Sequence, residues 1–180
     1  ITYNINELHQ SRVNRYTQTL ERQIVSLVTR ASKHMQPAEL AFTQGQVSFA
    51  RNRRTPVGKA GPVDHSVPVL KITSPSEQLL AVLFGYACHN TTYGGNALRF
   101  NGDYAGFAQI ALEEKYPNMT AMFMMGCGGD INPEPRGRPE QAQQHGVSLA
   151  ASVNHALKGP LHPVRGPLTT RLERIDLHYV

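Results

Sequence analysis

Two short polar segments, each following an apolar run, hold the residues best suited to chemistry. The first is Tyr86-Ala-Cys-His-Asn-Thr91, which carries His89. The second is the glycine-rich segment Gly126-Cys-Gly-Gly-Asp-Ile-Asn-Pro133, which carries Asp130 and Asn132. Imidazole is a common zinc ligand, and glycines let the backbone approach a ligand closely. Because ligands bind at strand ends in open α/β sheets, we expect the two segments to form one site.

Each of these groups also has a purely structural interpretation. A single histidine at a strand end is often satisfied by backbone groups, and the glycine-rich segment could be a tight turn. Asp103 follows Gly102 at the start of an expected helix, so it suits an N-cap carboxylate that accepts backbone N–H groups. Cys127 could act as a nucleophile, but the sequence shows no partner that would stabilise a thiolate, which favours a packing role.

Two arginines begin a polar loop rich in glycine and proline, predicted over residues 51–65. They lie in Asn52-Arg-Arg54, and arginine forks suit a carboxylate, a phosphate or a developing oxyanion. A pair of solvated surface arginines is the alternative. His65, at the end of the loop, is either a second ligand or part of a hydrogen bond at the entry to the next strand.

The apolar pattern predicts the elements that position these segments. Three- and four-residue steps predict helices over residues 8–35, 103–116 and 140–157. Alternating or continuous apolar runs predict strands over 67–73, 79–87, 120–125 and 168–177, and a hairpin or bent strand with a turn at Gly45 over 39–50. We expect 79–87 and 120–125 to be buried, neighbouring strands joined by the helix 103–116. The residues of the last helix expected to face inward are Val147, Leu149, Ala150, Val153 and Leu157.

Strands that alternate with helices predict an α/β fold, with a layered sheet, buried central strands and flanking helices. The length of 180 residues fits one domain, and 40% hydrophobic with 17% charged residues indicates a folded globular chain. The first residue is Ile1, and residues 171–180 resemble an interrupted strand, so we expect a fragment of a longer protein and a partial domain. On that interpretation, the lack of a visible signal peptide says nothing about the compartment.

The charge and cysteine content narrow the function classes. The net charge of +5 comes mainly from scattered Lys and Arg, without the dense basic stripe of a nucleic-acid-binding protein. No apolar run approaches the roughly 20 residues that span a bilayer. Cys88 and Cys127 are too few for a disulfide framework, and they are either bridged or two free thiols.

Taken together and in order, the motifs resemble the N-terminal domain of the neutral/alkaline (non-lysosomal) ceramidase family. The segments that carry the resemblance are Asn52-Arg-Arg54, residues 61–70, Tyr86-Ala-Cys-His-Asn-Thr91, Gly102-Asp-Tyr-Ala-Gly-Phe107 and residues 126–133. They extend over most of residues 10–155, and the sequence looks most similar to the bacterial ceramidase-like proteins of this family. The resemblance implies that residues 1–180 are a fragment of the ceramidase-like N-terminal α/β domain.

The family hydrolyses the amide bond of N-acylsphingosines with one zinc ion, which polarises the amide carbonyl. Its zinc is held by two histidines, a glutamate and a tyrosine, and His89 matches one of the histidines. The resemblance implies that the other histidine precedes Ile1 and that the glutamate and tyrosine follow Val180. It also implies a substrate contact for Arg53, a small lipid-like amide substrate, contact with a membrane surface, and a secreted or periplasmic location.

One position departs from the family pattern. Characterised members have a serine directly before the proline of the second turn, and this chain has Asn132 there. Asn132 offers no nucleophile, whereas Asp130, two residues earlier, could face the metal or a water molecule. The alternatives to a ceramidase are therefore a zinc hydrolase of a different amide or ester, and a domain that only binds a lipid or a glycan.

Overall fold

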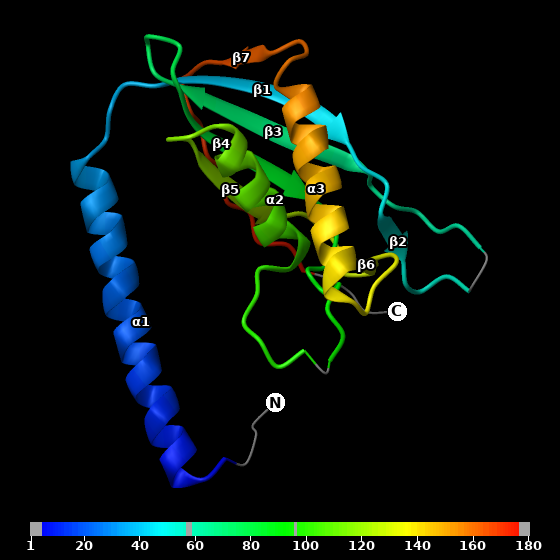
Figure 1. Cartoon of the computed structure of the whole chain (residues 1–180). Coiled ribbons are helices and arrows are strands. Elements are labelled where there is room, and N and C mark those ends of the chain that lie inside the picture. The colour runs from blue at the N-terminus through cyan, green and yellow to red at the C-terminus, as the bar shows by residue number, and fades with distance from the viewer. Residues whose placement is uncertain (1–4, 57–58, 96, 177–180) are drawn as a thin grey trace. The chain divides into compact units, whose positions relative to one another are not determined.

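The structure, a computed structural model, describes residues 5–56, 59–95 and 97–176. The chain divides into two parts, Ile1–Pro37 and Ala38–Val180. The first part contains the long helix α1, which extends over Glu7–Lys33 (Figure 1). Asn6 caps this helix, because its side-chain oxygen accepts a hydrogen bond of 2.9 Å from the backbone N–H of His9. The helix predicted over residues 8–35 is confirmed.

The second part is built on a five-stranded sheet with the order β5-β4-β3-β1-β7. These strands are β1 (Glu39–Gln46), β3 (Ser66–Thr73), β4 (Leu79–Tyr86), β5 (Thr120–Met125) and β7 (His162–Val164). Strands β4 and β5 are parallel, and the other neighbouring pairs are antiparallel. A separate two-stranded ribbon pairs β2 (Ala50–Asn52) with β6 (Ile131–Pro133).

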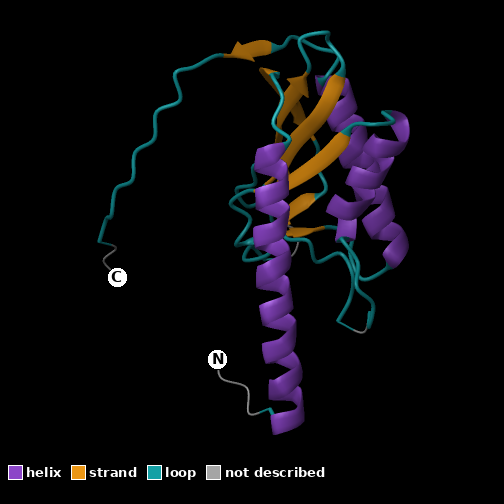
Figure 2. Cartoon of the chain, turned by 90° about the vertical axis from the view of Figure 1, so that its left-hand side faces the viewer, coloured by secondary structure: helices purple, strands orange, loops and turns teal. Residues whose placement is uncertain are grey.

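Two helices cover one face of the five-stranded sheet. Helix α2 (Asp103–Lys115) joins β4 to β5, and α3 (Pro139–Ala156) packs beside it (Figure 2). The predicted α/β fold, a layered sheet with flanking helices in a partial domain, is confirmed, as are the two parallel neighbouring strands joined by a helix. In the part of the chain that the structure describes, no helix has the length and apolar character needed to cross a membrane.

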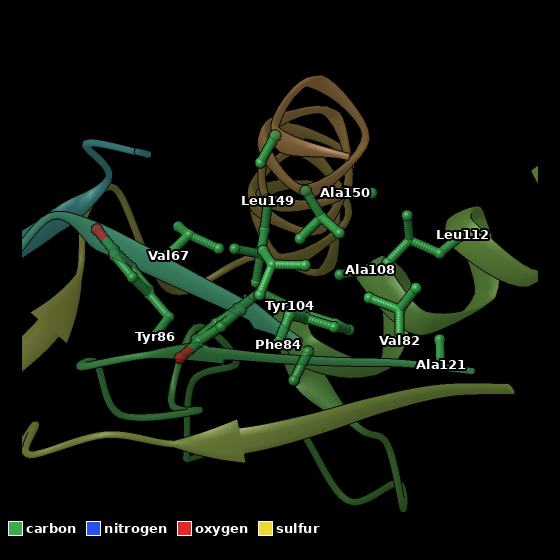
Figure 3. Packing of buried hydrophobic residues seen from close by; sticks show 14 of the residues in the cluster. Val67, Val82, Phe84, Tyr86, Tyr104, Ala108, Leu112, Ala121, Leu149 and Ala150 are labelled. Carbon is green, nitrogen blue, oxygen red and sulfur yellow. The ribbon is translucent and has the colours of Figure 1, made fainter. Parts of the chain in front are cut away.

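The hydrophobic core lies between this sheet and its two helices (Figure 3). Strand residues such as Val82 and Phe84 meet Tyr104 and Leu112 of α2, and α3 contributes Leu149. The two helices approach closely at one glycine of α3. A Cβ atom at position 146 would lie 2.4 Å from the Cβ of Phe107 and 2.7 Å from the carbonyl oxygen of Tyr104, so only glycine fits there.

The expected turn at Gly45 is wrong. Strand β1 continues through this residue and pairs it with Val67 of β3, so the segment 39–46 is one strand and not a hairpin. The glycine has a different role, because a Cβ there would lie 2.5 Å from the side-chain oxygen of Ser152 in α3. Gly45 therefore provides space for the helix above the sheet rather than a change of chain direction.

The structure corrects three further predictions, two about strands and one about a helix residue. Strand β5 is present, but as an edge strand it leaves Met124 59% exposed, so it is not a buried strand. No strand forms over residues 168–176, the strand beside β1 is instead β7, and residue 177 lies outside the described residues. In α3, Val147 faces solvent with 54% of its surface exposed, whereas the other predicted inward residues pack toward the core.

Candidate functional site

The ends of β4 and β5 bring the two polar segments together. The parallel register pairs Tyr86 with Met125, the last residues of the two strands, so both segments leave the same edge of the sheet. His89 then contacts the second segment directly, because its backbone N–H donates to the carbonyl oxygen of Ile131 at 3.0 Å. The structure therefore places His89, Asp130 and Asn132 in one region.

The ring of half-buried His89 has a defined orientation. Its Nδ1 lies 3.0 Å from the same carbonyl oxygen of Ile131. A carbonyl oxygen only accepts hydrogen bonds, so Nδ1 carries the proton and donates it to this contact. In the neutral ring Nε2 then keeps its lone pair, which is the arrangement that metal-binding histidines adopt when a carbonyl orients them. His89 therefore fits the role of a zinc ligand through Nε2.

The first turn of α2 holds the segment around His89 from both sides. The hydroxyl of Tyr104 donates a hydrogen bond of 2.6 Å to the carbonyl oxygen of Cys88, directly before His89. One carboxylate oxygen of Asp103 accepts from the backbone N–H groups of Thr92 at 2.8 Å and Tyr93 at 3.1 Å. Burial raises the pKa of the Tyr104 hydroxyl above its ordinary value, so the hydroxyl remains a donor.

Asp103 is not the N-cap that the sequence indicated, although its carboxylate does accept backbone N–H groups. The N-cap of α2 is Gly102, and Asp103 is the first helical residue, with a φ of 51°. Its second carboxylate oxygen accepts the backbone N–H of Tyr104 at 2.8 Å, and its own N–H donates to Asn101 at 2.9 Å. A buried side chain with positive φ and three accepted hydrogen bonds is a positioning group for the segment after His89.

The glycines of the second segment allow close contact with the first. A Cβ at position 128 would lie 2.8 Å from the backbone nitrogen of Cys88, and one at position 126 would lie 3.2 Å from the Cα of Ala87. No atom lies within 4 Å of a Cβ built at Gly129. Gly128 is thus required by the packing of the turn and Gly126 is tightly packed, which supports the structural interpretation for that part of the motif.

The β2–β6 ribbon places an arginine opposite Asn132. The antiparallel register pairs Arg51 with Asn132, and the ladder continues on one side with a hydrogen bond of 2.8 Å from the Arg53 N–H to the Asp130 carbonyl oxygen. The guanidinium of Arg53 also donates from Nη2 to the carbonyl oxygen of Gly129 at 3.0 Å. Arg53 therefore lies against the glycine-rich turn.

Asn52 is a site residue that the sequence did not single out. Its buried amide donates to a carboxylate oxygen of Asp130 at 2.7 Å and to the Pro62 carbonyl oxygen at 3.2 Å. Its side-chain oxygen accepts the Arg54 N–H at 3.0 Å. Asn52 therefore ties the loop after β2 to the turn after β5, and it fixes one oxygen of Asp130.

His65, His145 and the two cysteines differ in their burial and contacts. The ring of His65 makes a contact at the entry to β3, where its Nδ1 lies 3.4 Å from the Tyr86 hydroxyl oxygen. His145, which carried no signal in the sequence, is buried against the Phe49 ring with centroids 4.4 Å apart. Cys88 and Cys127 are free thiols, Cys88 buried and Cys127 exposed, so Cys127 does not pack in the core.

Two neighbouring pockets lie along the ribbon. The smaller, of about 150 Å³, is lined by Arg51, Asn52, Arg53, Thr55, Asn132, Glu134 and Arg136. The larger, of about 490 Å³, has apolar residues such as Phe49 and Val63 in its wall together with the charged side chains of Arg51, Lys59 and Glu134. Arg51, Asn52 and Glu134 line both pockets. A ligand in the larger pocket could thus extend a polar group toward Asn132.

Solved structures share this arrangement of elements. A neutral ceramidase from Pseudomonas aeruginosa aligns with a TM-score of 0.68 and 19% identity over 80% of this chain and 26% of its own. The fold is ceramidase-like. A structure described as a ceramidase complexed with C2 aligns with the same TM-score and identity, over 77% of this chain and 25% of its own. The chain thus spans about a quarter of the length of these proteins.

The sequence comparisons add no family to this likeness. No protein-family model matches the chain, and no curated protein matches its sequence. At 19% identity the likeness to the ceramidase structures concerns the fold. The roles of His89, Asp130, Asn132 and Arg53 in a ceramidase-like reaction are therefore a matter for proposal.

Proposed function

We propose that this chain is part of a zinc-dependent hydrolase that cleaves the amide bond of N-acylsphingosine-like lipids. The observation that carries the proposal is the ring of His89, whose Nδ1–H is bound to the Ile131 carbonyl oxygen so that Nε2 is free to bind a metal. The ceramidase-like fold supports it. Zinc, when bound, would polarise the amide carbonyl, and its other ligands are expected outside residues 1–180.

The residues of this chain have separate roles in the proposed reaction. Water adds its oxygen to the acyl carbon, the C–N bond breaks, and a proton passes from the water to the departing amine. We assign the proton transfer to Asp130, because Asn52 binds one of its carboxylate oxygens and thereby orients the group. We assign the stabilisation of the carbonyl oxygen or a polar headgroup to Arg53. Its guanidinium is held in place by the hydrogen bond from Nη2 to the Gly129 carbonyl oxygen.

The metal assignment is tested on the full-length protein. His89→Ala should abolish bound zinc, measured by atomic emission, because it removes one of the expected ligands. His155→Ala, at an exposed histidine near the end of α3, is the matched control and should keep the zinc content of the parent. Circular dichroism should show that both variants fold. A folded His89→Ala protein with unchanged zinc would contradict the assignment.

Asn132 favours a second candidate function. The carboxamide has no nucleophile, so the domain would act on a different amide or ester, or bind a lipid or a glycan without catalysis. Hydrolysis assays with ceramide beside short N-acyl amides distinguish these possibilities. An Asn132→Ser variant that gains ceramide hydrolysis would support the ceramidase reaction, whereas no turnover of any of these compounds by either protein would favour a binding domain.

A further inference from the structure

Because side chains alternate between the two faces of the β2–β6 ribbon, several charged side chains lie on the same face. In β2 and the residue that follows it, Arg51 and Arg53 are two positions apart, and side chains two positions apart in a strand share a face. On the opposite side Asn132 and Glu134 have the same spacing, and Arg136 follows in the loop after β6. All five line the pocket of about 150 Å³, whereas Ala50 and Ile131 are buried on the other face.

The extended ladder keeps these two rows in register. Arg51 lies directly opposite Asn132, and a hydrogen bond of 2.8 Å from the Glu134 N–H to the Phe49 carbonyl oxygen continues the pairing on the other side. Directly opposite residues of antiparallel strands have Cα atoms roughly 4.5–5.5 Å apart. A ligand atom that contacts Asn132 is therefore within reach of the Arg51 guanidinium.

The pocket has an excess of positive charge. Three guanidinium groups, those of Arg51, Arg53 and Arg136, line it together with one carboxylate, that of Glu134. Within residues 5–56, 59–95 and 97–176, none of these arginines forms an ion pair with a carboxylate. Arginines pair readily with carboxylate and phosphate groups through two parallel hydrogen bonds. An anionic group in the pocket would supply the negatively charged partner that these arginines lack.

We propose that this pocket, the arginine pocket, binds an anionic group that the substrate carries close to its amide bond. The inference rests on the proposed function and names its substrate class, N-acyl amides with a carboxylate or a phosphate near the amide nitrogen. The small volume suits a single such group, while the larger neighbouring pocket, which shares Arg51, takes the adjoining part of the molecule. Asn132 then binds the substrate through its carboxamide beside the anion.

Binding is tested first with compounds that contain no amide bond and are not turned over. Isothermal titration of the full-length protein compares octyl phosphate, octanoate and the neutral octanol. At least one anion should bind about tenfold more tightly than octanol, since hydrogen bonds to charged groups are the stronger kind. The anion that binds more tightly identifies phosphate or carboxylate as the natural group, and its affinity should fall as salt is added.

A pair of variants distinguishes the pocket from the general positive charge of the protein. Arg51→Gln should weaken binding of the preferred anion about tenfold and leave octanol unchanged. Arg54→Gln removes the same charge three positions away, outside the pocket lining, and should change the affinity less than twofold. Equal affinities for the anions and octanol, or equal losses in the two variants, would overturn the proposal.

Hydrolysis separates this inference from the function on which it rests. The value of kcat/KM should be higher for N-octanoylglycine or phosphorylated N-octanoylethanolamine than for neutral N-octanoylethanolamine, and Arg51→Gln should remove the difference mainly through KM. If an anion binds through Arg51 but no amide is cleaved, the hydrolase function fails and the arginine pocket stands. If all three amides are cleaved equally and Arg51→Gln has no effect on binding, the arginine pocket fails and the hydrolase function stands.

Discussion

Removal of one hydroxyl group in the core should loosen the segment that carries His89. In Tyr104→Phe the ring stays in place, but the hydrogen bond of 2.6 Å to the Cys88 carbonyl oxygen is lost. Tyr104 and Cys88 are both fully buried, so water does not replace the missing donor. The variant therefore leaves a backbone acceptor without a partner next to His89.

The expected magnitude follows from this burial. A buried acceptor left without a hydrogen bond costs about 1–3 kcal/mol. If that cost is carried by local opening of the segment, the amides of residues 87–93 should exchange roughly 5- to 150-fold faster. Asp103 still binds the N–H groups of Thr92 and Tyr93 in this variant, so the far end of the segment should change less than the end near Cys88.

Hydrogen exchange followed by mass spectrometry on the full-length protein measures this effect. The matched control is Tyr116→Phe, which removes the hydrogen bond from the Tyr116 hydroxyl to the Asn154 side chain. Both of these residues are half-buried, so water can take the place of the hydroxyl and the loss should be small. If exchange in residues 87–93 is no faster in Tyr104→Phe than in Tyr116→Phe, the buried hydrogen bond does not hold the segment.

Two further predictions concern the packing of α2 on α3 and the two thiols. Gly146→Ala should destabilise the protein by about 1–3 kcal/mol, because a Cβ there lies 2.4 Å from that of Phe107, whereas Gly106→Ala, with open space at its Cβ, should stabilise it by about 0.5–1 kcal/mol. Thermal unfolding measures both, and equal shifts would contradict the packing argument. Iodoacetamide should label Cys127 in the native protein and Cys88 only after unfolding, because burial raises the pKa of the Cys88 thiol to about 12. Rapid native labelling of Cys88, or a disulfide found by mass spectrometry, would contradict this.

The elements most accurately predicted from the sequence are those whose pattern is local. The helices α2 and α3 and the strands β3 and β4 follow from apolar spacing, because each has a face that packs in the core. The pattern does not distinguish a central strand from an edge strand. Residues 120–125 are as apolar as a buried strand, yet β5 has a neighbour on one side only, and this depends on the order of strands in the sheet.

The site divides in the same way between what was predictable and what was not. The meeting of His89 with the turn at Asp130 follows from parallel strands that end at one edge, which is a rule of the fold class. The position of Arg51 opposite Asn132 depends on pairing between two three-residue strands far apart in the chain. The alternating charges at 51 and 53 and at 134 and 136 were the available signal, but such short stretches resemble ordinary loops.

The two halves of the site differ in how freely their residues can change. The half around His89 is held by buried groups, since Tyr104, Asp103 and Cys88 all lie in the core and Gly128 has no room for a side chain. Substitutions there disturb packing or leave a polar group without a partner, and such changes are costly.

The half around Asn132 lies on the outer face of the ribbon, where side chains are half-buried or exposed. Substitutions at such surface positions usually change the free energy of unfolding by only about 0.5 kcal/mol. The fold can therefore keep the position of His89 while the residues on the outer face of the ribbon vary. On this reasoning the ribbon, rather than the sheet edge at His89, would determine which acyl compound the proposed hydrolase recognises.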